Sequence, residues 1–327
     1  MMQTLIVKLK SSLTWRLGIP KRMLYSLSLN LLRISRPRLP KIINLPNISN
    51  ISADQSDFKI VIVTFSKRFF TNCLPLIKEL RASGVNQEIY VGINGDDGMS
   101  YDPTLRTNFL QEISVIPNVN PVSFGSFQGL SLIWNRCIQA ADSEIVIVLN
   151  DDLIVEKDYV ASTLDKMAGV AKSRGICLLN SGWSHFAIST KVFKEIGWFD
   201  ERLLGIGEED SDLTFRYEDF FGVSCFENSI HERGLIHDSS SVFDSNLAKG
   251  KGKYSLFNWV YIELKYNFGK GAISGMFDRP ATKQFADVNQ YPNFDWNQSL
   301  SIYRSEKDRE VVEKALNEKL GLLGDKK

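Results

Sequence analysis

One short segment of the sequence carries residue types that suit metal chemistry. Asn150, Asp151 and Asp152 directly follow the apolar run 144–149 (EIVIVL), so two carboxylates and an amide stand where a buried strand would end. Adjacent carboxylates repel each other, and the usual compensation is a hard divalent cation that also binds phosphate oxygens and water. Pairs of aspartates are also common in plain turns. The segment alone therefore leaves a metal site and a turn open.

A second acidic segment precedes a predicted helix that continues through Tyr217. Residues 205–212 (GIGEEDSD) place four carboxylates within five residues. Carboxylates at a helix start are favoured by the positive end of its dipole, so a charged first turn is one interpretation. Gly205 and Gly207 favour a second interpretation, a ligand site, because glycine lets the backbone approach a ligand closely.

His237 is one of three histidines in the sequence. A lone histidine is more often structural than functional.

Alternating strands and helices are expected to position these residues. Apolar runs and amphipathic spacing predict strands over 59–65, 88–93, 113–116 and 144–149, and helices over 73–83, 128–140 and 190–196. This order predicts an α/β fold with a mostly parallel sheet covered by helices on both faces. Such sheets bind ligands at the carboxyl ends of their strands. Residues 94–98 (NGDDG) and 150–152 both fall at such ends.

The composition is that of an ordinary globular protein. The chain has 327 residues, of which 43% are hydrophobic and 24% are charged, and this excludes a disordered or fibrous protein. A net charge of +1 gives no overall reason to expect a nucleic-acid partner. The four cysteines form no CxxC pair, which favours a reducing compartment. Because no segment reaches the roughly 20 apolar residues of a membrane span, and no cleavable signal is evident, we expect a cytoplasmic protein.

The first 53 residues form a basic arm. They hold nine lysines and arginines and no acidic residue. Apolar residues at helical spacing after Pro20 predict a short amphipathic helix, which could lie on an anionic membrane surface or pack on the body. Residues 36–57 contain three prolines and no clear period, so we interpret them as a linker. An aromatic stretch and a charged helix from about 305 to 320 are expected after residue 242.

Several short motifs occur in one order between residues 59 and 241. They are IVIVTF (60–65), NGDDG (94–98), IVIVLNDD (145–152), FDERL (199–203), GEEDSDLTFR (207–216) and IHDSSS (236–241). This ordered set resembles the inverting, family-2-type glycosyltransferases of GT-A fold, including those that build bacterial surface glycans with rhamnose and other sugars. The resemblance implies a catalytic domain over 57–242, with a nucleotide-sugar half (57–152) and an acceptor half (153–242). A basic arm with linker (1–56) and a C-terminal extension (243–327) would flank it.

The activity that the resemblance implies is sugar transfer from a nucleotide-diphosphate donor to a hydroxyl of a glycan or lipid-linked glycan, with Mn²⁺ or Mg²⁺ as cofactor. Asp210 would be the catalytic base, and Asp152 would bind the metal with help from Asp151 and His237. The donor-side residues would be Thr64, Phe65, Asn94, Asp96 and Asn150, and the acceptor-side residues would be Trp183, His185, Glu209 and Asp212. Asn150 replaces the first acidic residue of the family's metal motif, which leaves open how strongly metal is held.

Some of these residues also have structural interpretations. Phe65 could pack in the core, and Trp183 and His185 could be buried beneath the sheet. The basic arm suggests peripheral association with the inner face of the cell membrane, where lipid-linked glycans are assembled.

Two other functions compete with glycosyl transfer. A sugar nucleotidyltransferase usually has a glycine-rich loop after its first strand, whereas residues 66–70 (SKRFF) contain no glycine. A non-catalytic carbohydrate-binding or scaffolding protein would keep the fold without turnover. The intact Asp152, Asp210 and His237 argue against it, because unused charged groups that cost stability are normally lost.

Overall fold

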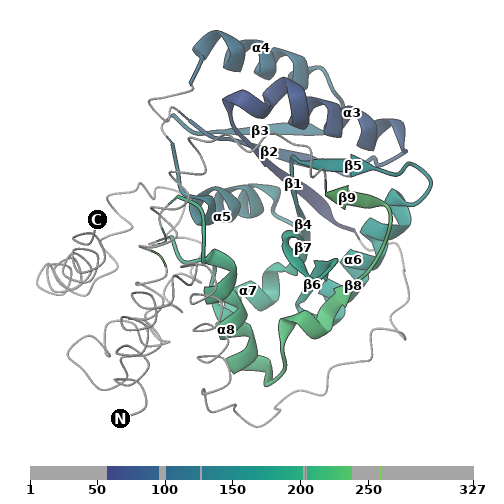
Figure 1. Cartoon of the computed structure of the whole chain (residues 1–327), viewed down its shortest axis with the longest axis vertical. Helices are drawn as coiled ribbons and strands as arrows, with labels where there is room; N and C mark the ends of the chain where they lie inside the picture. Colours follow the sequence, from purple (N-terminus) through teal and green to yellow (C-terminus); the bar gives the residue numbers. More distant parts are fainter. Residues whose placement is uncertain are drawn as a thin grey trace, which may run out of the picture.

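The computed structural model describes residues 57–95, 101–125, 127–201, 203, 205–237 and 258. Within these residues, a seven-stranded sheet has the order β3-β2-β1-β4-β7-β6-β8, and a small separate sheet pairs β5 with β9 (Figure 1). The strands are β1 (Lys59–Thr64), β2 (Ile89–Ile93), β3 (Val119–Ser123), β4 (Ile145–Asn150), β5 (Leu153–Val155), β6 (Ile176–Leu179), β7 (Gly182–Ser189), β8 (Ser229–Ile230) and β9 (Leu235–His237).

Helices alternate with these strands along the chain. They are α3 (Leu74–Ala82), α4 (Pro103–Ser114), α5 (Leu130–Ala141), α6 (Val160–Arg174), α7 (Thr190–Ile196) and α8 (Glu209–Phe221). Short helical turns are η2 (Ser66–Arg68), η3 (Phe69–Cys73) and η4 (Cys225–Asn228). The bounds of α7 are those predicted from the sequence, and α3 and α5 lie within two residues of their predicted ranges.

The pairing of the strands confirms the expected mostly parallel sheet. β1 pairs in parallel with both β2 and β4, and β2 pairs in parallel with β3. β7 runs antiparallel to both β4 and β6, so it brings a later part of the chain back beside the centre of the sheet. The sheet therefore includes both the predicted nucleotide-sugar half and the predicted acceptor half.

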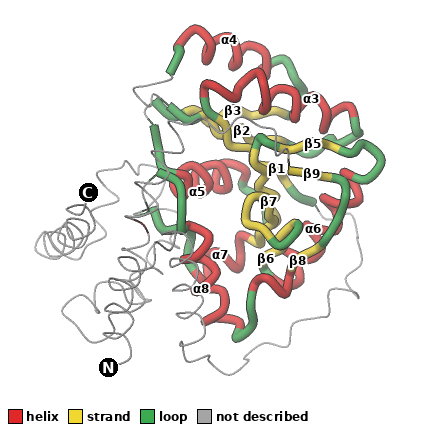
Figure 2. The backbone as a smooth tube through the Cα atoms, viewed as in Figure 1, coloured by secondary structure: helices red, strands yellow, loops and turns green. Residues whose placement is uncertain are grey.

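The sheet separates two apolar cores, which is why its central strands are apolar on both faces. On one face, Ile60 and Ile62 of β1 lie in a core with residues of α3, α4 and α6. On the other, Val61 lies in a core with residues of α5, α7 and α8. Figure 2 shows α3 and α4 on one side of β1–β3 and α5 on the other. The expected cover of helices on both faces is confirmed.

The predicted strand over 113–116 is wrong, because these residues end helix α4 or follow it. Asp102 caps this helix by accepting hydrogen bonds from the backbone N–H groups of Thr104 and Leu105, and Pro103 occupies its first turn. Ile113 is buried on the core face of the helix. The third strand lies farther along the chain, at β3. The structure also contains α6 and β6, which the apolar pattern did not predict.

The basic arm, most of the linker and all of the C-terminal extension except Asn258 lie outside the described residues. The predicted amphipathic helix, the predicted helix near residue 305 and the proposed domain boundaries therefore stay predictions. Among the described residues, none of the helices is long and apolar enough to span a membrane. The four cysteines are buried and form no disulfide.

Candidate metal and catalytic site

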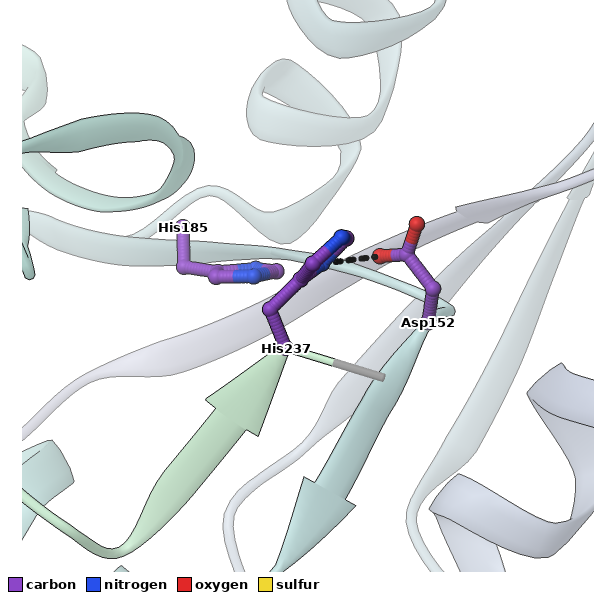
Figure 3. Close-up of side chains that lie close together, drawn as sticks. All are labelled: Asp152, His185 and His237. Carbon is purple, nitrogen blue, oxygen red and sulfur yellow. Dashed lines mark ion pairs between the residues drawn. The ribbon is translucent and has the colours of Figure 1, made fainter. Parts of the chain in front are cut away.

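Asp152, His185 and His237 come together at the carboxyl end of β4 (Figure 3). One candidate ligand atom from each side chain lies within 4.8 Å of the other two. The strand registers explain this meeting. Leu149 of β4 is opposite His185 of β7, and Leu153 of β5 is opposite His237 of β9. Two strand pairings thus bring residues from three distant parts of the chain to one point.

Two atoms of this group are buried without a hydrogen-bond partner. Asp152 Oδ1 and His185 Nε2 form no hydrogen bond with any described residue. Asp152 Oδ1 lies 3.6 Å from Nδ1 of His237, as the dashed line in Figure 3 marks. Buried polar atoms in native proteins nearly always have partners, so unpaired atoms that converge on one point indicate a ligand site.

His185 is held as a neutral imidazole. Burial lowers the pKa of His185 to about 4, and the nearby His237 acts in the same direction while Asp152 opposes it. The backbone N–H of Asn150 donates to His185 Nδ1 at 3.3 Å. A neutral imidazole has a single lone pair, so His185 can offer Nε2 to a metal only by giving up this long contact.

Asp151 is paired within the protein on both of its oxygens. Arg68 Nη2 lies 2.8 Å from Asp151 Oδ1, and the Thr64 hydroxyl donates to Asp151 Oδ2 at 2.7 Å. Burial raises the pKa of Asp151 to about 7, although Arg68 and Thr64 both oppose the rise. Asp152 therefore offers the unpaired carboxylate oxygen at this strand end, and Asp151 holds Arg68.

The residues present fit a divalent metal ion. One carboxylate and two imidazoles would supply three ligands and leave positions for phosphate oxygens and water. A set with two imidazoles is softer than the all-oxygen sets that Mg²⁺ prefers, and of the two expected ions it favours Mn²⁺. The sequence analysis assigned His185 to the acceptor side, whereas the structure places it in this group.

The predicted donor-side residues that the structure describes lie at neighbouring strand ends. The Asn94 N–H donates to the backbone oxygen of Thr64, and Val63 is opposite Asn150 in the sheet register. The Asn94 side chain donates to Gln128 O at 3.1 Å and accepts from the Gln128 N–H at 2.8 Å, so it joins β2 to the segment before α5. Phe65 is half-buried, with its ring centroid 5.7 Å from Arg68 Cζ. Asp96 lies outside the described residues.

The acidic segment forms the first turn of α8, and its carboxylates bond locally. Glu208, in the left-handed region at φ 73°, accepts a hydrogen bond from the Ser211 hydroxyl. Glu209 accepts from the Gly207 N–H at 2.6 Å. Asp210 accepts from the Ser211 N–H at 2.8 Å and is the least buried of the four carboxylates. These local bonds support the interpretation that the segment serves in part as the charged first turn of α8.

Two predicted acceptor-side residues are engaged inside the protein. Asp212 is fully buried and accepts from Nε and Nη2 of Arg216 at 2.9 and 2.7 Å. Trp183 is 7% exposed, and its indole N–H donates to the Thr214 hydroxyl while its ring packs edge-on against Phe186. For Trp183 the structure shows the buried alternative. We no longer assign acceptor contacts to these two residues.

Backbone contacts connect the start of α8 to the carboxyl edge of the sheet. The Leu130 N–H donates to the backbone oxygen of Gly205 at 2.7 Å. A Cβ atom at Gly129 would lie 3.2 Å from the backbone oxygen of Leu203, so glycine permits this close approach. Asn258 donates from its side chain to Gly207 O at 2.6 Å. The loop before Asp210 is therefore fixed to the start of α5, next to the end of β2.

Sequence reasoning did not single out Arg68, and it placed His185 on the acceptor side and not beside Asp152 and His237. The available signal for Arg68 was a cation four residues after Thr64, at the same sheet edge as two carboxylates. No comparable signal existed for His185, because its position depends on β7 pairing antiparallel with β4.

No family model matches the chain, and a search of curated proteins finds no relative. Among solved structures, it is similar to a mannosyltransferase from Pyrobaculum calidifontis in complex with GDP-Man and Mn²⁺, with a TM-score of 0.45, 13% identity and coverage of 100% of both chains. It is also similar to glucosyl-3-phosphoglycerate synthase from Mycobacterium tuberculosis in complex with Mn²⁺, UDP and glucosyl-3-phosphoglycerate, with a TM-score of 0.45, 11% identity and coverage of 70% of this chain and 84% of that one.

A further similar structure is GalNAc-T7 with UDP, GalNAc and Mn²⁺, with a TM-score of 0.41 and 11% identity. That match covers 69% of this chain but only 55% of the GalNAc-T7 chain. TM-scores below 0.5 at such low identities assign no activity. The function proposed next therefore rests on the residues of the site.

Proposed function

We propose that this chain is a metal-dependent, inverting glycosyltransferase. It would move a sugar from a nucleotide-diphosphate donor to a hydroxyl group of a glycan or lipid-linked glycan. The observation that carries the proposal is the group of Asp152, His185 and His237, whose candidate ligand atoms, two of them buried without a hydrogen bond, converge at the carboxyl edge of a mostly parallel sheet. Ligands bind α/β sheets at this edge.

Asp152, His185 and His237 would hold Mn²⁺, or Mg²⁺, next to the donor diphosphate. A bound metal would stabilise the negative charge that develops on the departing nucleoside diphosphate. Thr64, Asn94 and Asn150 lie at the neighbouring strand ends and would orient the donor, together with Phe65 and Asp96.

Asp210 would act as the base. It would accept the proton of the acceptor hydroxyl as that oxygen bonds to the anomeric carbon of the donor sugar, while the bond to the diphosphate oxygen breaks on the opposite face. A single displacement of this kind inverts the anomeric centre. Support comes from the position of Asp210 in a turn that is bonded to the first residue of α5, and from its greater exposure than Glu208, Glu209 and Asp212. Glu209 would orient the acceptor.

A role in surface-polysaccharide assembly at the inner face of the cell membrane belongs to the same proposal. Its support is the basic arm, in which each cation near an anionic surface contributes about 1 kcal/mol. Deleting residues 1–53 should abolish co-sedimentation with anionic liposomes. Unchanged co-sedimentation would contradict membrane binding by the arm.

A thermal-shift screen tests the donor site. The purified protein would be melted with UDP-, dTDP- and GDP-sugars, each with and without Mn²⁺, because a ligand that binds only the folded state raises the melting temperature. We expect a metal-dependent rise with one nucleotide class and no such rise in Asp152→Asn. A cooperatively melting protein that responds to no donor would contradict the proposal.

A further inference from the structure

Arg68 bridges the two carboxylates at the end of β4. Its Nη2 atom lies 2.8 Å from Asp151 Oδ1 and 3.3 Å from Asp152 Oδ2. Arg68 ends the turn η2 directly after β1, and Thr64 at the end of β1 holds the other oxygen of Asp151. One strand and the turn after it thus supply both partners of Asp151.

The two oxygens of Asp152 face different neighbours. Oδ2 faces Arg68, and Oδ1 is the atom that lies 3.6 Å from His237 Nδ1 without a hydrogen bond. A metal ion bound at Oδ1 would therefore share one carboxylate with a guanidinium. The side chains of Arg68 and Asp152 are only 19% and 13% exposed, so water screens the repulsion between the two cations poorly.

The local charges limit how well a divalent cation can bind by itself. Asp151 and Asp152 carry at most two negative charges, and Arg68 neutralises one of them at close range. An imidazole that binds a metal is neutral, so His185 and His237 would add no negative charge to the site. A nucleoside diphosphate would bring the missing negative charge, along with phosphate oxygens that bind the same metal.

We propose that Arg68 is a positioning residue that makes metal binding depend on the nucleoside diphosphate. The inference rests on the proposed function, because it assumes the metal site at Asp152. In the absence of donor, the guanidinium holds the acidic pair together and weakens the binding of a bare cation. When the diphosphate is present, its charge offsets that of Arg68, and metal and nucleotide bind with positive cooperativity.

Mn²⁺ binding measured by electron paramagnetic resonance tests this inference without any assay of turnover, because hydrated Mn²⁺ loses its sharp signal when it binds protein. The full chain would be titrated with Mn²⁺ alone and with Mn²⁺ plus UDP or GDP, corrected for the Mn²⁺–nucleotide complex. We expect wild-type protein to bind Mn²⁺ at least about tenfold more tightly with one of the two nucleotides. Equal affinity in both conditions would overturn the inference.

Arg68→Gln should bind Mn²⁺ alone about tenfold more tightly than wild type, and its nucleotide dependence should shrink by a similar factor. Arg68→Lys keeps the charge and should stay within about twofold of wild type, as should Lys67→Gln, which removes the same charge from the exposed neighbouring residue. A purely structural role of Arg68 would not tighten metal binding. If Arg68→Gln does not fold, tighter binding of Mn²⁺ alone by Arg68→Lys would still overturn the inference.

Other outcomes separate this inference from the proposed function. Unchanged Mn²⁺ affinity in Arg68→Gln, with weaker nucleotide binding in the absence of metal, would show that Arg68 binds the phosphates directly and would overturn the inference alone. Wild-type protein that binds Mn²⁺ neither with nor without nucleotide would overturn the proposed metal site as well.

Discussion

The end of β4 and the first turn of α8 are both acidic in sequence, but their side chains are bonded differently. At the end of β4, Asp152 Oδ1 and His185 Nε2 are buried and have no hydrogen-bond partner among the described residues. In the first turn of α8, Glu209 accepts a backbone N–H and Asp212 accepts two N–H groups of Arg216.

This difference separates a ligand site from a structural turn better than charge does. Leaving a buried donor or acceptor unpaired costs about 1–3 kcal/mol, so a fold that keeps two such atoms in one place has a site that a ligand can complete. Carboxylates bonded to their own turn stabilise the helix start instead. Within the α8 turn we regard Asp212 as structural, and the roles of Asp210 and Glu209 stay proposals, supported for Asp210 by its greater exposure.

Asp152→Asn should have the largest effect of the substitutions considered. It removes the proposed charged metal ligand, and a metal contributes several kcal/mol to the stabilisation of a phosphate leaving group, so turnover should fall by about 1,000-fold or more. Mn²⁺ affinity, measured by electron paramagnetic resonance, should fall in parallel. Turnover within about threefold of wild type would place the metal elsewhere or remove it from the mechanism.

Asp210→Asn should lower turnover by about 100- to 1,000-fold, because a general base typically contributes factors of this size. The variant should still show the metal-dependent thermal shift with donor, since Asp210 does not touch the metal group in this account. Steady-state kinetics and the thermal shift would be measured on one preparation. Loss of donor binding together with turnover would assign Asp210 to the donor site.

Asp212→Asn should lower the free energy of unfolding. It leaves the buried Arg216 charge without its carboxylate, and breaking a buried ion pair in this way costs about 3–5 kcal/mol. The denaturant midpoint should fall accordingly, while the Mn²⁺ affinity of the folded protein stays as in wild type. A stable variant that loses acceptor binding would show that the two acidic regions differ less than proposed.

Glu201→Gln should change the pH dependence of stability. Burial raises the pKa of Glu201 from 4.5 to about 7, although Asn135 and Arg136 oppose the rise. Between these values the folded protein binds more protons than the unfolded chain, so stability falls as pH rises through this window. Glutamine imitates the protonated form and should make the protein more stable than wild type at pH 8, by at most about 3 kcal/mol, but not at pH 4. Equal stability at both pH values would contradict the buried, protonated Glu201.

Sequence periodicity predicted many of the strands and helices, because the spacing of apolar residues within a short segment favours one of these two structures. The continuous apolar runs at β1, β2 and β4 have the pattern of strands buried on both faces, and the structure has strands there. The strand prediction for 113–116 was wrong because the helix start, with Asp102 as the cap and Pro103 in the first turn, was not recognised. The helix that begins there includes Ile113 and Ser114.

The site was predicted less completely, because strand order is not a local property. Asp152 follows a strand end that the apolar pattern predicts. The resemblance to family-2-type glycosyltransferases pointed to His237. The place of His185 follows from the antiparallel pairing of β7 with β4, 36 residues apart at Leu149 and His185, which no period in the sequence encodes. The contacts of Arg68 with Asp151 and Asp152 are equally non-local, since they depend on the parallel neighbours β1 and β4.

Electron spin-echo spectroscopy of bound Mn²⁺ tests the central claim most directly, because it detects nitrogen nuclei coordinated to the metal. With UDP or GDP present, wild-type protein should show couplings from two imidazole nitrogens. His237→Gln and His185→Gln should each lose one of them. Mn²⁺ bound with no nitrogen coupling would show that the histidines do not ligate it, and would contradict the metal site on which the proposed activity depends.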